Sequence, residues 1–172
     1  MRLELIVDVT VEAANWDRAV ADLEVLCQRV VRGAACHVVD LSGMDLDGVA
    51  EISVLFADDA RVQILNREWR GQDKPTNVLS FPGEDFRDGL AQHEPRVPRL
   101  LGDVVVALET TQGEAGAQHK TLVDHLSHLL VHGVLHVLGF DHTTEEHAGE
   151  MEALEVEILA DLGVPCPYLD RI

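Results

Sequence analysis

The chain has 172 residues, of which 47% are hydrophobic and 26% are charged. This size and composition exclude a disordered chain and predict a single folded domain over residues 1–172. No apolar stretch is long enough to cross a membrane, and the three cysteines form no Cys-x-x-Cys pair. We therefore expect a cytoplasmic protein without a disulfide framework or a membrane partner.

The formal net charge of −18 argues against a general nucleic-acid-binding protein, because a polyanion is usually met by a basic surface. No DNA partner is expected. The charge is uneven, however, since seven of the thirteen basic residues lie between positions 60 and 99. That segment is either a less acidic face or part of a binding groove, and charge alone does not decide between them.

Polarity patterns predict the order of strands and helices. They indicate a strand at 3–9, a helix at 16–32, a strand at 49–57, a helix at 59–69, strands at 77–81 and 101–108, and helices at 118–138 and 144–162. Gly33 is the predicted stop of the first helix, and residues 82–99 form the longest predicted loop. Because strands and helices do not strictly alternate, we expect an α+β fold, a small mixed sheet of about four strands covered by about five helices.

Two of these helices have a distinct apolar or charged side. In the helix at 59–69, Val62, Leu65 and Trp69 share one side. The last helix carries many glutamates, which we interpret as a solvent-exposed face that keeps the protein soluble. They are Glu145, Glu146, Glu150, Glu152, Glu155 and Glu157.

Three histidines follow the frame His-x-x-x-His-x-x-Gly-x-x-His, at His132, His136 and His142. In a helix, His132 and His136 lie about 40° apart on one face, so both imidazoles can reach one ion. Gly139 allows the helix to end in a sharp turn that brings His142 back. Three neutral imidazoles leave a fourth position open, as in catalytic zinc sites. The sequence therefore predicts one zinc ion per chain at the end of a core helix.

His125 and His128 extend the same helical face towards its N-terminus. His128 is an alternative ligand, but the turn at Gly139 favours the set of His132, His136 and His142. The two remaining histidines either line the cleft and orient the ligands or are simply hydrogen-bonded or solvated.

Gly133 stands where zinc peptidases of the His-Glu-x-x-His type carry their general base. Glycine cannot take a proton, although zinc by itself lowers the pKa of a bound water to about 7. Phosphodiester cleavage depends strongly on neutralising charge at the phosphoryl oxygens, so this chemistry is favoured. A metallopeptidase with a base from elsewhere is the least favoured alternative.

Three segments together resemble the signature of the YbeY family, namely HLSHLLVHGVLHVLGFDH at 125–142, REWRGQDKPTNVLSFP at 67–82 and LGDVVVAL at 101–108. The resemblance implies a bacterial metal-dependent, single-strand-directed endoribonuclease. Its implied roles are maturation of the 3′ end of 16S rRNA and ribosome quality control. The implied partners are rRNA and the small ribosomal subunit, together with ribosomal proteins and an assembly GTPase.

The resemblance also assigns site residues. The family's zinc ligands fall on His132, His136 and His142, and its functionally important arginine falls on Arg70. A guanidinium group binds phosphate in a bidentate manner and stabilises developing negative charge, so Arg70 is the expected catalytic and substrate-binding cation. Lys74 is the second expected phosphate contact.

Two positions depart from the family, where aspartate is common at the position of Asn77 and tyrosine at that of Phe140. Neither change removes a metal ligand, but both leave the route of the proton open. The nucleophile is either a water or the ribose 2′-hydroxyl. A ribosome-assembly factor with a structural metal is the alternative from a different functional class.

Overall fold

The computed structural model describes residues 4–42, 48–84 and 97–169. Their strands are β1 (Glu4–Val11), β2 (Val49–Ala57), β3 (Val78–Pro82) and β4 (Arg99–Ala107), and their helices are α1 (Asn15–Ala19), α2 (Leu23–Ser42), α3 (Asp59–Arg70), α4 (Leu108–Ala117), α5 (Leu122–Val137) and α6 (Glu145–Asp161). The sheet order is β1-β2-β4-β3, with β3 antiparallel to β4 and the other pairs parallel. This confirms the predicted α+β fold with a mixed sheet.

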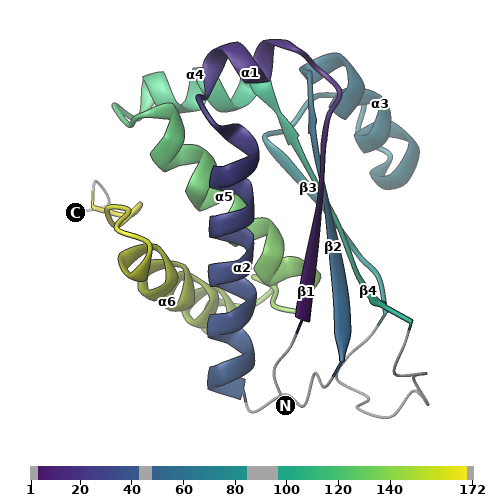
Figure 1. The fold of residues 1–172 in the computed structure, drawn as a ribbon. Coiled ribbons are helices and arrows are strands. Elements are labelled where there is room, and N and C mark those ends of the chain that lie inside the picture. Colours follow the sequence, from purple (N-terminus) through teal and green to yellow (C-terminus); the bar gives the residue numbers. More distant parts are fainter. Residues whose placement is uncertain (1–3, 43–47, 85–96, 170–172) are drawn as a thin grey trace.

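The two faces of the sheet are covered unequally (Figure 1). Helices α2 and α5 pack on one face of the sheet and enclose the larger hydrophobic core. Helix α6 packs against these two helices. Among the described helices, only α3 covers the other face, where Val62 packs with Leu79 and Val105 in a smaller core. Strand β3 therefore forms an edge of the sheet between α3 on one face and α5 on the other.

The prediction of one helix at 16–32 ending at Gly33 is wrong. Two helices occupy this region, separated near Asp22, which adopts a positive φ of 51°. Helix α2 continues through Gly33, where an added Cβ would lie 3.0 Å from Cδ2 of Leu162. The glycine permits close packing against the residues after α6 instead of ending the helix.

Helix α4 was not predicted, because its sequence contains two glycines and two threonines and lacks an apolar periodicity. Tertiary hydrogen bonds fix its first turn. The carboxylate of Asp59 accepts from the backbone N–H of Thr110 at 3.0 Å and from its hydroxyl at 2.8 Å. In return, Glu109 accepts from the backbone N–H of Asp59 at 2.9 Å. The first turns of α3 and α4 thus stabilise each other next to the ends of β2 and β4.

The start of one predicted helix also changes. The helix predicted at 118–138 begins at Leu122, because the hydroxyl of Thr121 caps it by accepting from the N–H of Asp124 at 3.1 Å. The predicted loop at 82–99 falls largely on residues 85–96, outside the described residues. Within the ranges that the structure describes, no helix is both long and apolar enough to cross a membrane.

Candidate metal centre

Helix α5 ends in a tight turn that brings the third histidine back towards the first two. Gly139 has a φ of 98°, and its N–H donates to the carbonyl of His136 at 3.0 Å. The N–H of Phe140 donates to the carbonyl of Leu135, also at 3.0 Å. This pair of bonds is the Schellman motif, which requires the left-handed conformation that glycine adopts at low cost. The chain reverses there and His142 follows.

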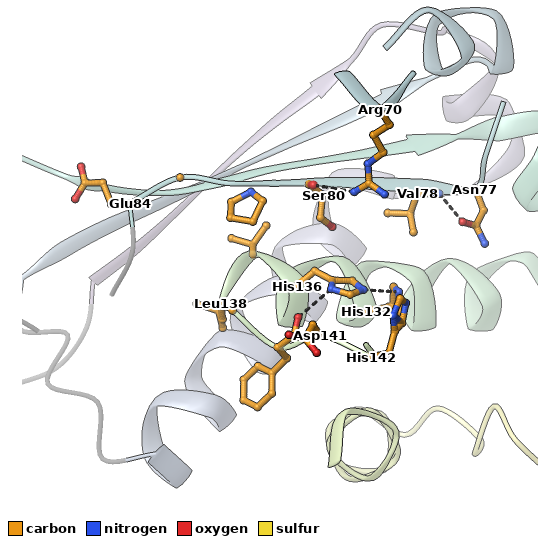
Figure 2. Close-up of a pocket in the computed structure, with 15 residues that line it drawn as sticks. Arg70, Asn77, Val78, Ser80, Glu84, His132, His136, Leu138, Asp141 and His142 are labelled. Carbon is orange, nitrogen blue, oxygen red and sulfur yellow. Dashed lines mark hydrogen bonds between the residues drawn. The ribbon is translucent and has the colours of Figure 1, made fainter. Parts of the chain in front are cut away.

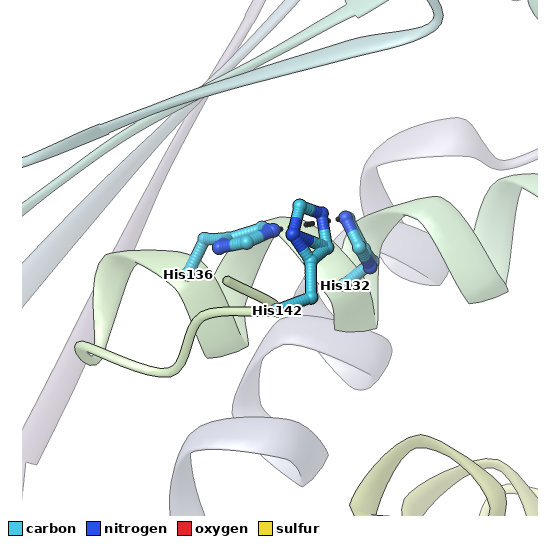
Figure 3. Close-up of side chains that lie close together, drawn as sticks. All are labelled: His132, His136 and His142. Atoms are coloured by element: carbon cyan, nitrogen blue, oxygen red, sulfur yellow. Dashed lines mark hydrogen bonds between the residues drawn. The ribbon is translucent and has the colours of Figure 1, made fainter. Parts of the chain in front are cut away.

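The three predicted ligands lie together (Figure 3). One nitrogen from each of His132, His136 and His142 falls within 4.8 Å of the other two. The rings of His132 and His136 are half-buried, whereas His142 is exposed at the mouth of the site. No carboxylate belongs to this set among the described residues, and a donor set made of imidazoles suits zinc and other late transition metals better than magnesium or calcium.

Hydrogen bonds on the far side of two rings fix which nitrogen faces the cluster. Nδ1 of His136 donates to the carbonyl of Phe140 at 2.9 Å, and Nδ1 of His132 donates to Oε1 of Glu155 at 2.6 Å. Burial and the neighbouring His132 lower the pKa of His136 to about 4, which favours the neutral ring. In the neutral tautomers that these bonds select, each Nε2 carries a lone pair.

The two Nε2 atoms of His132 and His136 face each other at only 3.0 Å. Two lone pairs at this distance repel unless a cation or a shared proton lies against both. The Nδ1 atoms are already used, so either a proton shared between the two Nε2 atoms or a metal ion bound by both satisfies the pair. The geometry therefore fits the predicted metal centre.

The prediction that Glu155 is exposed to solvent is wrong. This residue was assigned to the solvent-exposed face of the last helix, yet only 1% of it is exposed. Burial raises its pKa, but hydrogen bonds from His128, His132 and Tyr168 outweigh this and lower the pKa of Glu155 to about 2. A carboxylate held ionised beside a ligand fixes the ring orientation and offsets part of the charge of a bound metal.

The position of Glu155 among the apolar residues of α6 indicated that it would be buried. Glu155 lies four residues after Met151 and three before Ile158, both of which are buried. It therefore sits in the apolar stripe of α6, where a charge is costly unless it is paired. Tyr168, which also bonds to Glu155, lies beyond α6 and carried no such signal.

The other two histidines of α5 bond to carboxylates through the opposite nitrogen. Nε2 of His125 lies 2.7 Å from Oε2 of Glu114, and Nε2 of His128 lies 3.0 Å from Oε2 of Glu155. Burial lowers the pKa of His125. Neither residue belongs to the three-histidine cluster, although His128 shares its carboxylate with His132.

The cluster opens into a cavity of about 600 Å³ between α5 and β3. Arg70, the last residue of α3, extends to the edge of β3, with Nη2 3.4 Å from the carbonyl of Ser80 (Figure 2). The structure thus brings Arg70 into the same cavity as the histidines. Lys74 is exposed and does not line this cavity.

Comparisons with known proteins identify the family to which the chain belongs. A family model described as "Endoribonuclease YbeY" matches residues 13–163. The chain belongs to the YbeY family. Relatives named Endoribonuclease YbeY include one from Paramagnetospirillum magneticum, 52% identical over 96% of each chain, and one from Azorhizobium caulinodans, 46% identical over 94% of this chain and 95% of the relative.

A further relative of the same name, from Allorhizobium ampelinum, is 43% identical over 98% of each chain. The solution structure of a protein from Thermotoga maritima aligns with a TM-score of 0.51 over 92% of both chains, at 20% identity. That similarity shows a shared fold. The resemblance to the YbeY family drawn from the sequence is confirmed.

Gly133 has a packing role in this member of the YbeY family. A Cβ at this position would lie 2.7 Å from Cγ1 of Val104 and 3.3 Å from the hydroxyl of Ser80, which itself donates to the carbonyl of Gly133 at 3.1 Å. Position 133 faces the sheet, and a glutamate there would collide with β4. The same close approach seats α5 against β3 and β4.

The two departures from the family pattern have separate consequences. The amide of Asn77 lines the cavity and donates to the carboxylate of Glu114 at 3.0 Å, a contact that an ionised aspartate would make repulsive. Phe140 orients His136 through its backbone carbonyl, so this role does not depend on its side chain.

Proposed function

We propose that this YbeY-family protein is a zinc-dependent endoribonuclease that cuts single-stranded segments of rRNA. The observation that supports this most directly is the cavity shared by Arg70 and the three histidines. We further propose that it matures the 3′ end of 16S rRNA and acts in ribosome quality control. The whole chain, residues 1–172, would form one cytoplasmic domain with one zinc ion.

Zinc bound there would supply Lewis-acid polarisation of a phosphodiester and a water of lowered pKa. The chain contributes the orientation of the ligands. His132 and His136 present Nε2 because Glu155 and the carbonyl of Phe140 hold their Nδ1 atoms. Rings fixed in this way need no rearrangement when the ion binds, which favours tight binding.

Arg70 would bind the phosphate that is cut. Its contact with the carbonyl of Ser80 is long, at 3.4 Å, so the guanidinium group has donors left for a substrate. A planar guanidinium group pairs with two phosphoryl oxygens and stabilises the charge that develops on them. Lys74 would add a weaker contact to the RNA backbone outside the cavity.

The acidity of the protein is compatible with an RNA substrate because charge is distributed unevenly. The cavity contains two carboxylates, Glu84 and Asp141, and one guanidinium group, Arg70. A divalent ion bound by the imidazoles would raise the formal charge of this lining by two, and the buried Glu155 behind His132 would offset part of that increase. The acidic remainder of the surface would limit indiscriminate RNA binding.

A ribosome-assembly factor with a structural metal is the second candidate. Structural zinc sites are closed by four protein ligands, whereas the group found among the described residues has three. This difference favours catalysis. Binding to the small ribosomal subunit, to ribosomal proteins and to an assembly GTPase is compatible with either candidate.

The test is the substitution Arg70→Ala, with Arg67→Ala as the matched control. Arg67 lies one turn earlier on α3, pairs with Asp73 at 3.8 Å and does not line the cavity. We expect Arg70→Ala to lower the cleavage rate of a precursor rRNA by roughly 100-fold with zinc content unchanged, and Arg67→Ala to leave it near the wild-type rate. Equal rates in the wild type and Arg70→Ala would contradict the role of Arg70.

A further inference from the structure

A second cavity, which we call the outer groove, lies on the sheet face that α3 covers only in part. Its volume is about 430 Å³. Its walls are largely apolar, and its floor carries the carboxylate of Asp103 on β4 beside Ser53 on β2. Trp69, Phe81 and Arg61 stand at its sides.

Trp69 is the most unusual residue of this groove. The sequence placed it on the same helical face as the buried Val62, yet 70% of it is exposed. Its ring meets the ring of Phe81 at a centroid distance of 6.0 Å and an angle of 65°. This edge-to-face contact orients the indole while leaving most of its surface available to a partner.

The outer groove and the metal cavity adjoin across the edge strand β3. Arg70 and Ser80 line the metal cavity, whereas their chain neighbours Trp69 and Phe81 line the outer groove. The alternation along β3 accounts for the second pair, because successive side chains point to opposite faces of the sheet. A strand of RNA that crosses this edge would meet both cavities in succession.

We propose that the outer groove binds a nucleobase of the RNA, stacked on Trp69, next to the phosphate held by Arg70. This inference rests on the proposed function. The chemistry of the groove favours a base over a phosphate, because the carboxylate of Asp103 repels a phosphate but accepts hydrogen bonds from amino groups of bases. Stacking on an aromatic side chain is how single-stranded RNA is commonly held.

The backbone of such a nucleotide would find a cation within reach. Arg61 lines the groove and pairs with Glu12 at 3.4 Å, with both side chains more than 40% exposed. An exposed ion pair of this kind contributes little to stability, so exchanging the carboxylate for a phosphate costs little. The groove thus offers an aromatic platform with one cation beside it.

The chain is suited to a direct test, because it has only two tryptophans. Trp16 is fully buried and its indole N–H donates to the carbonyl of Ala57 at 2.8 Å, so a change of tryptophan emission on adding RNA reports Trp69. The probe is a short single-stranded RNA oligonucleotide added to the full chain in the presence of a chelator. Under these conditions, binding is measured without cleavage.

We expect the RNA to quench the emission, Trp69→Ala to weaken RNA binding by roughly 10-fold, and Trp69→Phe to retain most of the affinity. Val25→Ala is the control, because Val25 is 67% exposed on α2 and lines neither cavity. Unchanged emission, or equal affinity of the wild type and Trp69→Ala, would overturn the proposal and leave the groove to a protein partner.

Failure of this inference is distinguishable from failure of the proposed function. If the zinc-loaded wild type cleaves RNA and Trp69→Ala binds and cleaves equally well, only the stacking site is wrong. If RNA quenches Trp69 and the zinc-loaded wild type does not cleave, the stacking site stands and the endoribonuclease proposal fails.

Discussion

Helix α5 carries two pairs of histidines on one face, and the two pairs differ in the nitrogen that a protein partner occupies. His132 and His136 use Nδ1, towards Glu155 and a backbone carbonyl, and so keep Nε2 for the cluster. His125 and His128 use Nε2, towards Glu114 and Glu155. A partner that accepts from Nδ1 leaves Nε2 free to bind a metal ion in the cluster. A carboxylate that bonds to Nε2 instead occupies the nitrogen that would otherwise bind the ion.

The largest expected effect is a loss of zinc and of RNA cleavage when a histidine of one pair is changed, but not when one of the other pair is changed. We predict that His132→Ala loses bound zinc and lowers RNA cleavage by roughly 1,000-fold, because two imidazoles hold the ion poorly and misplace it. His125→Gln should keep one zinc per chain and a cleavage rate within about 3-fold of the wild type, because its partner lies outside the cluster. Zinc content and single-turnover rates measure both. Equal losses in the two variants would erase the distinction.

Glu155 supports one member of each pair, so changing it tests whether orientation matters. Glu155→Gln should weaken zinc binding by about 10- to 100-fold, because the amide no longer fixes His132 as an Nδ1 donor. Zinc competition with a chelating dye measures this effect, and Glu152→Gln on the more exposed side of α6 is the control. An unchanged zinc affinity would show that the ligands need no carboxylate behind them.

The same carboxylate makes stability depend on pH. The pKa of Glu155 is about 2 in the folded protein and ordinarily 4.5, so the stabilisation is complete above pH 4.5 and is lost as the pH falls towards 2. The wild type should exceed Glu155→Gln in free energy of unfolding by on the order of 3 kcal/mol at pH 7, and by less at pH 3. Chemical unfolding of both metal-free proteins measures this difference. A gap that stays constant with pH would contradict the assignment.

The histidine cluster was predictable because all of its determinants lie within one helix and the turn that follows. His132 and His136 share a helical face by spacing alone, and Gly139 marks the reversal before His142. The supporting residues were not predictable in the same way, since Glu114 and Glu155 come from other helices. Only the position of Glu155 within an apolar stripe gave a hint.

The strands and helices were predictable to a similar extent, and the predictions of them that were wrong share one cause. Strands and amphipathic helices are predicted from the periodicity of their apolar residues, because each such element buries one face. Helix α4 lacks that periodicity and depends on Asp59, whereas α2 continues through Gly33 because Leu162 packs against it. Both depend on contacts between distant segments, which no local pattern records.

The packing of α5 gives a further test, because Gly133 lies between the ligands His132 and His136 in the sequence and faces the sheet. Gly133→Ala should lower the free energy of unfolding by about 1–3 kcal/mol, since the new Cβ meets Val104 at 2.7 Å. Gly149→Ala on α6, with no atom within 4 Å of the new Cβ, should instead raise it by roughly 0.5–1 kcal/mol. Chemical denaturation measures both, and a neutral Gly133→Ala would show that the helix can move away from β4.

The smallest expected effect is that of Lys74→Ala on RNA binding. Arg70 lies in the cavity and Lys74 outside it, so Lys74→Ala should weaken RNA binding only about 2- to 3-fold and lower the slope of affinity against salt by about one charge. A titration at several salt concentrations measures this. A fall in the cleavage rate of Lys74→Ala as large as that expected for Arg70→Ala would place Lys74 at the reacting phosphate.

The central claim is that the three histidines hold the ion on which RNA cleavage depends. The most direct measurement is cleavage of a precursor rRNA by chelator-stripped protein as zinc is added back, for the wild type and His136→Ala. We predict that wild-type cleavage rises with bound zinc to a limit at one ion per chain, and that His136→Ala stays inactive at the same zinc concentrations. Cleavage by stripped protein, or by His136→Ala without bound zinc, would contradict the claim.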